Sequence, residues 1–259
     1  MNSTLSKGMI APFIRRHSID MRQYLPEHYR CYNDFFTRKI HLGARSLDQC
    51  PTHLIAPCDG KLSVYPITEN GYFMIKGAPY SVQTMLQNQE LARRFEGGVC
   101  LVFRLSVDDY HRYCYFDSGT GEDRVFIRGS LHTVQPIALD RYRFYHTNCR
   151  EYTVLHTAHF GMAVQCEVGA LLVGKICNIQ GRSPFVRGDE KGWFAFGGST
   201  VVLLFQQGVV EMDPEIIENT TAGFETVVKL GEKIGERIRV DSDIQYHPEC
   251  ESGDCSEGR

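Results

Sequence analysis

The feature that most constrains the fold is a series of short apolar segments joined by glycine-rich connections, which fills most of the chain after Gly119. Each segment is bounded by turn-forming residues and is rich in β-branched and aromatic side chains, a pattern typical of β-strands. The strands predicted in this way are residues 124–134, 151–155, 162–168, 171–179, 193–196, 200–205 and 209–212. Many short strands with such connections predict a β-sandwich or a barrel-like β core.

The chain before Gly119 has a mixed pattern. Residues 1–27 are mildly amphipathic, with apolar and basic side chains. Residues 29–40 follow a Pro26-Glu27 start signal and space their aromatic side chains at helical intervals,. Residues 80–95 also place apolar side chains at helical spacing, which predicts a further helix.

Three more strands are predicted in this first half. Residues 61–67 and 72–76 flank Asn70-Gly71, a dipeptide that strongly indicates a hairpin, and residues 99–105 form an apolar run,. The predicted class is therefore α+β and mainly β, with N-terminal helices packed on the β core. We divide the chain into an N-terminal helical part (1–54), a β-rich domain (55–240) and a flexible tail (241–259).

The composition argues against several classes of protein. The 28 Lys and Arg residues are balanced by 31 Asp and Glu, so a basic face for nucleic acid is not expected,. The sequence has no run of 18 apolar residues that could span a bilayer, so any membrane contact is expected to be peripheral. The ten cysteines follow no secretory signal and are expected to be reduced, mostly buried thiols,. His247, Cys250 and Cys255 lack a second pair with zinc-ligand spacing, so no metal is expected.

Gly197-Gly198-Ser199-Thr200 lies between two predicted strands and allows two interpretations. The tetrapeptide is an ordinary hairpin connection, and taken alone it favours that interpretation. Glycines also permit close approach to the Gly198 carbonyl. Attack by the Ser199 hydroxyl on that carbonyl would convert the amide into an ester, and β-elimination would then break the chain. Hydrolysis of the resulting dehydroalanine would leave a pyruvoyl group.

Two distant segments carry further titratable side chains. Asp59-Gly60 is in itself a common turn sequence, in which the carboxylate bonds to nearby backbone amides. Asp109-Tyr110-His111-Arg112 follows a predicted strand and surrounds a histidine with charged residues that tune its pKa. Taken alone, this segment favours a histidine that is satisfied within an aromatic loop.

In their order along the chain, these segments resemble the phosphatidylserine decarboxylase family of pyruvoyl enzymes. The resemblance covers nearly the whole chain from about residue 29. The matching segments are residues 35–38, 57–60, 109–112, 133–136, 148–151, 168–174 and 196–200.

The resemblance implies a proenzyme that converts phosphatidylserine into phosphatidylethanolamine. Such a proenzyme cleaves itself between Gly198 and Ser199, giving a β chain that ends at residue 198 and an α chain that starts with the pyruvoyl group. This covalent cofactor would form a Schiff base with the substrate amine and delocalise the carbanion left when CO2 departs. Residues 55–240 would then be the catalytic domain.

The resemblance also assigns roles to individual residues. Asp59 matches the catalytic aspartate, Ser199 the nucleophile and pyruvoyl precursor, and His111 the first histidine of a Tyr-His-Arg-x-His motif. Cys114 stands where that motif has its second histidine, which family members use to activate the serine.

The base for self-cleavage is consequently open. His111, Cys114 as an accessory thiolate, or a histidine from elsewhere, such as His132 or His159, would each supply one. We expect His111 to be the base, because it lies in the best-matched segment, and also to return a proton to the substrate.

A lipid substrate would keep its acyl chains in the bilayer, so the predicted enzyme docks peripherally on the cytoplasmic side of the membrane through residues 1–27. Two alternatives are a pyruvoyl-dependent amino-acid decarboxylase and a non-catalytic lipid-binding β protein. The predicted partners are phosphatidylserine and the two chains of the cut proenzyme, with no nucleic acid. The sequence leaves open whether the protein forms a homo-oligomer.

Overall fold

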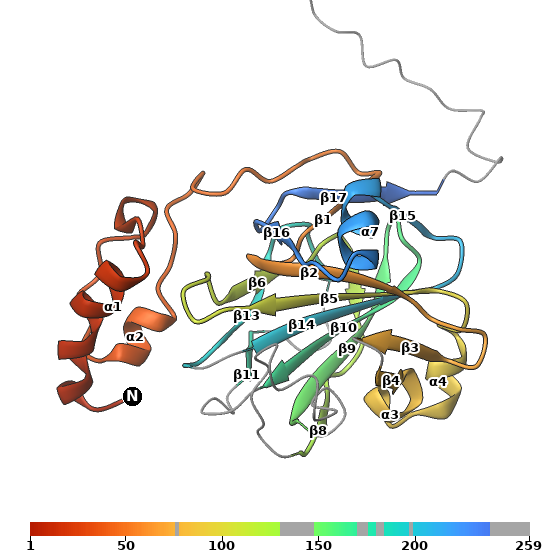
Figure 1. Ribbon diagram of the computed structural model, residues 1–259, viewed down its shortest axis with the longest axis horizontal. Coiled ribbons are helices and arrows are strands. Elements are labelled where there is room, and N and C mark those ends of the chain that lie inside the picture. The colour runs from red at the N-terminus through yellow and green to blue at the C-terminus, as the bar shows by residue number, and fades with distance from the viewer. Residues whose placement is uncertain (76–77, 130–147, 170–175, 180–183, 197–198, 239–259) are drawn as a thin grey trace, which may run out of the picture.

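A computed structural model describes residues 1–75, 78–129, 148–169, 176–179, 184–196 and 199–238. Its main element is a nine-stranded antiparallel sheet (Figure 1). In spatial order its strands are β12 (Pro184–Phe185), β7 (Gly119–Gly121), β9 (Arg150–Thr157), β10 (Met162–Gly169), β14 (Ser199–Phe205), β5 (Val99–Leu105), β2 (Gly60–Pro66) and β16 (Thr226–Val228), with β8 (Val125–Ile127) beside β9. Among the described residues the sheet does not close. The α+β, mainly β class is confirmed, and the core is not a closed barrel.

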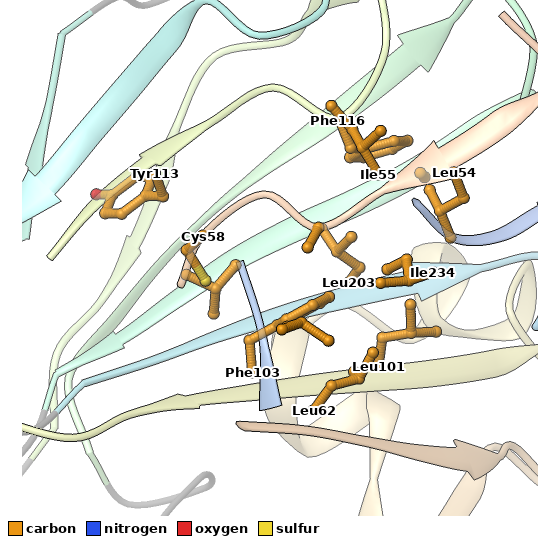
Figure 2. Packing of buried hydrophobic residues seen from close by; sticks show 14 of the residues in the cluster. Leu54, Ile55, Cys58, Leu62, Leu101, Phe103, Tyr113, Phe116, Leu203 and Ile234 are labelled. Carbon is orange, nitrogen blue, oxygen red and sulfur yellow. The ribbon is translucent and has the colours of Figure 1, made fainter. Parts of the chain in front are cut away.

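The central strands of this sheet are buried on both faces, because their side chains alternate between two hydrophobic clusters. On β14, Val201 and Leu203 belong to one cluster, and Val202 and Leu204 to the other. The first cluster is covered by a small sheet of β1 (His53–Ile55), β17 (Lys233–Arg237) and β15 (Val210–Met212), and by α7 (Pro214–Thr221) (Figure 2). The second is covered by α3 (Val82–Leu86) and α4 (Gln89–Arg93).

A second small sheet lies on the first face of the long sheet. Its strands are β11 (Ile176–Asn178), β13 (Glu190–Phe194) and β6 (Arg112–Cys114). Tyr113 and Phe194 from this small sheet belong to the same cluster as Leu203, so the two sheets share a core. A β-bulge interrupts β13 between Glu190 and Gly192.

The N-terminal segment forms a separate helical layer at one side of the molecule (Figure 1). It contains η1 (Thr4–Met9), α1 (Ile10–Arg16), η2 (Met21–Gln23) and α2 (Tyr32–Phe36). Ile10, Tyr32, Phe35 and Phe36 form its own small core, against which Phe196 packs. No helix in the described part of the chain is long and apolar enough to cross a membrane.

Two predicted helices were wrong in detail, and one helix was missed. The helix predicted over residues 29–40 covers only α2, because the following residues turn into a bridge between Ile40 and Tyr24. The helix predicted over residues 80–95 is two short helices, since Gln87 is left-handed (φ 50°) and the Asn88 side chain caps α4. Helix α7 was missed, although Pro214 occupies its first turn,.

The hairpin predicted at Asn70-Gly71 was also wrong, although the turn itself forms. The Gly71 amide donates to the Thr68 carbonyl, and Gly71 has a φ of 72°. The flanking strands nevertheless join different sheets: β2 pairs with β5 and β16, whereas β3 (Tyr72–Ile75) pairs with β4 (Ala78–Ser81). A turn signal fixes where a chain reverses, but burial decides which strands pair.

Candidate active site

The predicted site residues Asp59 and Ser199 lie at the same end of the central strands. β14 begins at Ser199, which pairs with Leu105, the last residue of β5. On the other side of β5, Lys61 pairs with Arg104, and Asp59 directly precedes β2. Adjacent strands are about 4.8 Å apart, so the ends of β2 and β14 lie about 10 Å apart across β5.

His111 reaches this end of the sheet through the connection from β5 to β6. Its carbonyl accepts a hydrogen bond from the Phe194 amide at 2.9 Å, so His111 lies beside the strand that leads toward Ser199. The Phe36 ring of α2 packs against the His111 ring, with centroids 3.9 Å apart, and also against Phe196 at 5.2 Å. The N-terminal helical layer therefore covers the site. Gly198, the other half of the predicted cleavage site, lies outside the described residues.

The hairpin interpretation of Gly197-Gly198-Ser199-Thr200 does not fit the strand pairing. β13 pairs with β11 and β6, whereas β14 pairs with β10 and β5. The tetrapeptide thus connects strands of two different sheets, and Ser199 stands where the chain enters the core.

Oγ of Ser199 and Nε2 of His111 are buried and have no hydrogen-bond partner among the residues that the structure describes. Ser199 is 0% exposed and His111 is 1% exposed. Nδ1 of His111 lies 2.9 Å from the Asp109 carbonyl, an acceptor only, so Nδ1 carries the proton and Nε2 keeps its lone pair,. Leaving such groups unpaired costs about 1–3 kcal/mol each, which points to a functional reason for keeping them.

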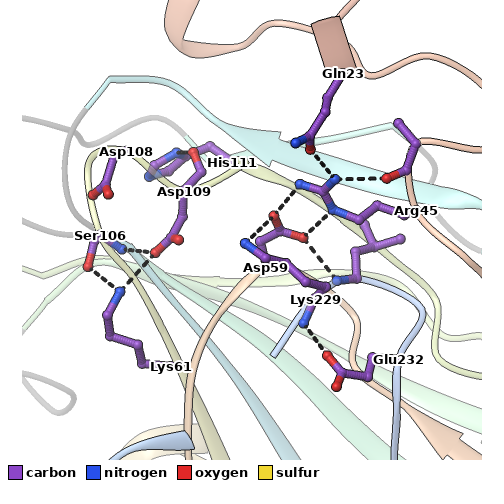
Figure 3. A network of polar contacts seen from close by, with 12 residues as sticks. Gln23, Arg45, Asp59, Lys61, Ser106, Asp108, Asp109, His111, Lys229 and Glu232 are labelled. Atoms are coloured by element: carbon purple, nitrogen blue, oxygen red, sulfur yellow. Dashed lines mark hydrogen bonds and ion pairs between the residues drawn. The ribbon is translucent and has the colours of Figure 1, made fainter. Parts of the chain in front are cut away.

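The environment of His111 keeps its ring neutral. Burial and the charge of Arg38 lower the pKa of His111 to about 3. A neutral imidazole with a free Nε2 is able to accept a proton. Nearby, Lys61 and the Ser106 amide bind the Asp109 carboxylate at 3.4 and 2.7 Å, which fixes the loop that orients His111 (Figure 3).

Asp59 is buried but ionised. Arg45 binds its carboxylate with two hydrogen bonds, of 2.9 and 2.6 Å, and the Leu230 amide and Lys229 Nζ bind it at 3.0 and 3.4 Å (Figure 3). Burial tends to raise the pKa of Asp59, but the Arg45 hydrogen bonds and charge outweigh it, so the pKa lies below its ordinary value of 3.8. Arg45 also donates to Gln23 Oε1 at 2.7 Å, which ties the N-terminal layer to this carboxylate.

A polar pocket of about 160 Å³ opens beside Asp59. Its walls come from the N-terminal layer, from the loop before His111 and from Lys229, and they include Asp20, Arg45 and Asp108. The pocket thus presents both carboxylates and cations. Such walls suit a small ligand that itself carries both signs of charge.

The other predicted bases lie elsewhere. His159 sits between β9 and β10, next to the end of β14 marked by Phe205, and its ring pairs with Asp117 at 2.9 Å. Six residues of strand separate Phe205 from Ser199, about 20 Å. His132 lies outside the described residues.

Cys114 is also displaced from Ser199. Its carbonyl accepts a hydrogen bond from Gln165, which pairs with Leu203, four residues or about 14 Å along β14 from Ser199,. Burial raises the pKa of the Cys114 thiol to about 12. The thiol is therefore neutral at ordinary pH, which disfavours a role as a thiolate base.

Sequence reasoning missed the partners that define this site. Arg45 lies in a segment without a recognisable pattern, and Lys229 lies in the weakly patterned C-terminal part. Phe36 belongs to a segment that matches the family, but its contact with His111 was not foreseen. These contacts join parts of the chain that are far apart in sequence, so local signals do not reveal them.

We expect Arg45→Met to destabilise the protein by about 3 kcal/mol at pH 7, because it leaves the buried Asp59 charge with only the longer Lys229 contact and the Leu230 amide to compensate it,. Since the folded-state pKa of Asp59 is lowered, the pair stabilises the protein above pH 3.8, and this contribution is lost as the pH falls further,. The difference between variant and wild type should accordingly shrink below pH 3.8. Urea unfolding of variant and wild type at pH 7 and again below pH 3.8 measures this difference in stability. Adding Asp59→Asn to Arg45→Met should recover part of the stability lost at pH 7. Equal stability of Arg45→Met and wild type at pH 7 would contradict this account.

Comparisons with known proteins identify the family. A family model described as phosphatidylserine decarboxylase matches residues 32–236. Phosphatidylserine decarboxylase proenzyme 2 of Clostridium acetobutylicum is 52% identical over 235 residues, covering 91% of this chain and 80% of that protein. The proenzymes of Desulfitobacterium hafniense strain Y51 and Clostridium novyi are each 40% identical, covering 92% of this chain and 81% and 82% of their own lengths. Because the family model matches the chain from α2 through the segments that carry Asp59, His111 and Ser199, and the relatives cover more than nine-tenths of it, the chain belongs to the phosphatidylserine decarboxylase family.

Proposed function

We propose that this protein is a phosphatidylserine decarboxylase that cuts its own chain between Gly198 and Ser199 and uses the resulting pyruvoyl group to release CO2 from the lipid. The observation that carries the proposal is that Ser199 Oγ and His111 Nε2 are both buried without a hydrogen-bond partner in the described part of the chain, at the end of the sheet where the ionised Asp59 also lies. A nucleophile and a base in one water-poor site are what self-cleavage requires.

Self-cleavage begins when Ser199 Oγ attacks the Gly198 carbonyl carbon while its proton passes to His111 Nε2. The C–N bond breaks, the Ser199 nitrogen takes up a proton, and an ester replaces the amide. Loss of the Ser199 Cα proton then expels the Gly198 carboxylate and separates the chains. The charge of Asp59 favours the protonated form of His111, so it stabilises the imidazolium that forms during the attack.

The residues present fit a pyruvoyl group at position 199. The Ser199 side chain is fully buried at the start of β14, and none of the described residues hydrogen-bonds to its hydroxyl. When formed, the group supplies an electron sink for the charge left on the substrate by CO2 loss. His111 is placed to return a proton to the substrate, while Phe36 and Phe196 exclude water from this side of the site.

The N-terminal layer has the surface character needed to reach a lipid. Leu5 is 90% exposed, Met9 is 48% exposed, and Lys7, Arg15 and Arg16 of the same helical layer are also exposed. Apolar side chains insert at the boundary of a bilayer, and each nearby Lys or Arg adds about 1 kcal/mol of attraction to anionic lipid. We propose that this surface docks the protein peripherally on the membrane that holds its substrate.

Charge reversal of Lys7, Arg15 and Arg16 to Glu should weaken binding to phosphatidylserine vesicles at least about 100-fold, since three attractions of about 1 kcal/mol are lost. Vesicle co-sedimentation measures this. Reversal of Arg93 and Arg94 on α4, well away from α1, is the control and should bind normally (Figure 1). Equal binding by both variants would rule out this docking surface. Substitution is preferable to deleting residues 1–27, because deletion removes Gln23 from Arg45.

Substrate choice is tested by CO2 release from carboxyl-labelled phosphatidylserine in vesicles and from labelled free serine. The proposal predicts release from the lipid and almost none from serine. Release from free serine alone would indicate an amino-acid decarboxylase. No release from either, by an uncut chain, would favour the lipid-binding alternative.

A further inference from the structure

One charged residue stands out on the face of the sheet that carries Ser199. Directly paired residues of antiparallel strands point to the same face, and Ser199 pairs with Gly169, which has no side chain,. The next residue of β10 on that face is Glu167, which pairs with Val201. Along the described lengths of β5, β10 and β14, every other side chain on this face is uncharged. Glu167 is therefore the charged side chain that these described strand lengths place on the same face as Ser199, and it is 0% exposed.

The Glu167 carboxylate connects β10 to the small sheet above it. Lys191 of β13 donates to Oε1 at 2.7 Å, and Asn178 of β11 donates to Oε2 at 3.1 Å. Asn178 also donates to Glu151 of β9 at 2.7 Å and accepts from the Tyr113 hydroxyl of β6 at 3.1 Å. All three strands of the small sheet are thus linked to Glu167.

The fold departs from regular geometry to place Lys191 in this position. Lys191 lies within the bulge between Glu190 and Gly192, and bulges re-aim side chains, often beside active sites,. Its side chain is only 1% exposed, against 0% for Glu167. A buried ion pair generally stabilises a protein no better than well-packed apolar residues would, so stability alone does not explain the Lys191–Glu167 pair.

The strands linked in this way are those that hold His111. Tyr113 follows His111 by two residues, and Phe194, three residues after Lys191, donates its amide to the His111 carbonyl. Glu167 itself belongs to the strand paired with Ser199. The cluster therefore connects the backbone that carries His111 to the backbone that carries Ser199.

We propose that Lys191, Glu167 and Asn178 form a positioning cluster that holds His111 Nε2 in register with Ser199 Oγ for self-cleavage. This inference rests on the proposed self-cleavage. A displacement of about 1 Å between reacting groups is able to slow a reaction 100-fold, so a loosened cluster should slow cleavage without unfolding the protein.

The test replaces the ion pair with apolar residues of similar size, Glu167→Leu with Lys191→Met. The purified chains are denatured at intervals after synthesis, and mass spectrometry measures the cut fraction. We expect the double variant to fold, with a melting temperature near that of wild type, and to be cut at least 100-fold more slowly. Lys191→Arg keeps the charge and should remain within a few-fold of wild type.

Leu204→Ala is the matched control for stability, because Leu204 lies on the opposite face of β14. If the melting temperature of Leu204→Ala falls by as much as that of the double variant and Leu204→Ala is cut equally slowly, then the effect of the cluster is only structural and the proposal fails. Cleavage of a folded double variant at the wild-type rate would also overturn it. If the double variant does not fold, Asn178→Ala decides: cutting at least about tenfold slower supports the proposal, and a wild-type rate refutes it. An uncut wild-type chain would instead overturn the proposed function on which the inference rests.

Discussion

Replacing Ser199 with alanine is expected to leave the protein as one uncut chain. Alanine lacks the oxygen that attacks the Gly198 carbonyl, and an ordinary peptide bond does not break on the time scale of expression and purification. Gel electrophoresis under denaturing conditions, followed by intact mass, measures the result.

Thr200→Val is the matched control for the Ser199 variant. The Thr200 hydroxyl is also buried and has no hydrogen-bond partner within the described ranges. The Thr200 side chain lies on the opposite face of the sheet from Ser199, with those of its strand neighbours Arg104 and Val168. Valine has nearly the same shape, so this variant should still be cut. If Thr200→Val stayed whole while Ser199→Ala was cut, the nucleophile would have been assigned to the wrong residue.

Replacing His111 with glutamine should slow self-cleavage by about 100-fold to 10,000-fold, the usual contribution of a positioned base. Cys114→Ala should be cut within a few-fold of the wild-type rate, because the Cys114 thiol is neutral and the Cys114 backbone contacts Gln165 at the level of Leu203, about 14 Å along β14 from Ser199,. Time courses of chain cutting for the two variants, made in parallel, distinguish the candidates. A large loss in Cys114→Ala with none in His111→Gln would reverse the assignment.

The pH dependence of cleavage gives an independent check on His111. A base acts in its deprotonated form, and His111 has a pKa of about 3. The wild-type rate should consequently stay level from pH 8 down to about pH 5. An exposed histidine with an ordinary pKa near 6.5 would instead lose rate about tenfold per pH unit below 6.

The strands were predictable from sequence where the chain packs in the centre of the sheet. Residues 99–105 and 162–168 are mainly apolar because both of their faces are buried, and both are strands in the structure; Arg104, Gln165 and Glu167 are the polar exceptions. The pairing of strands was not predictable in the same way. Asn70-Gly71 forms its turn, but whether β2 pairs with β3 or with β5 depends on packing between residues far apart in sequence.

The site, like the fold, was predictable only in part. Asp59, His111 and Ser199 were predicted from their motifs, and the fold brings them to one end of the sheet; their catalytic roles stay predictions. Arg45 and Lys191 were not predicted, because each acquires its partner only in the folded chain. Glu167 did leave a signal: a carboxylate within an otherwise uncharged strand needs a buried cation.

The most direct test of the account is the intact mass of the purified wild-type protein. The account predicts two chains, residues 1–198 and residues 199–259, with the smaller one beginning in a ketone that borohydride reduces and that blocks Edman degradation. A single chain with the mass of all 259 residues, or a smaller chain that begins with a free serine amine, would contradict it.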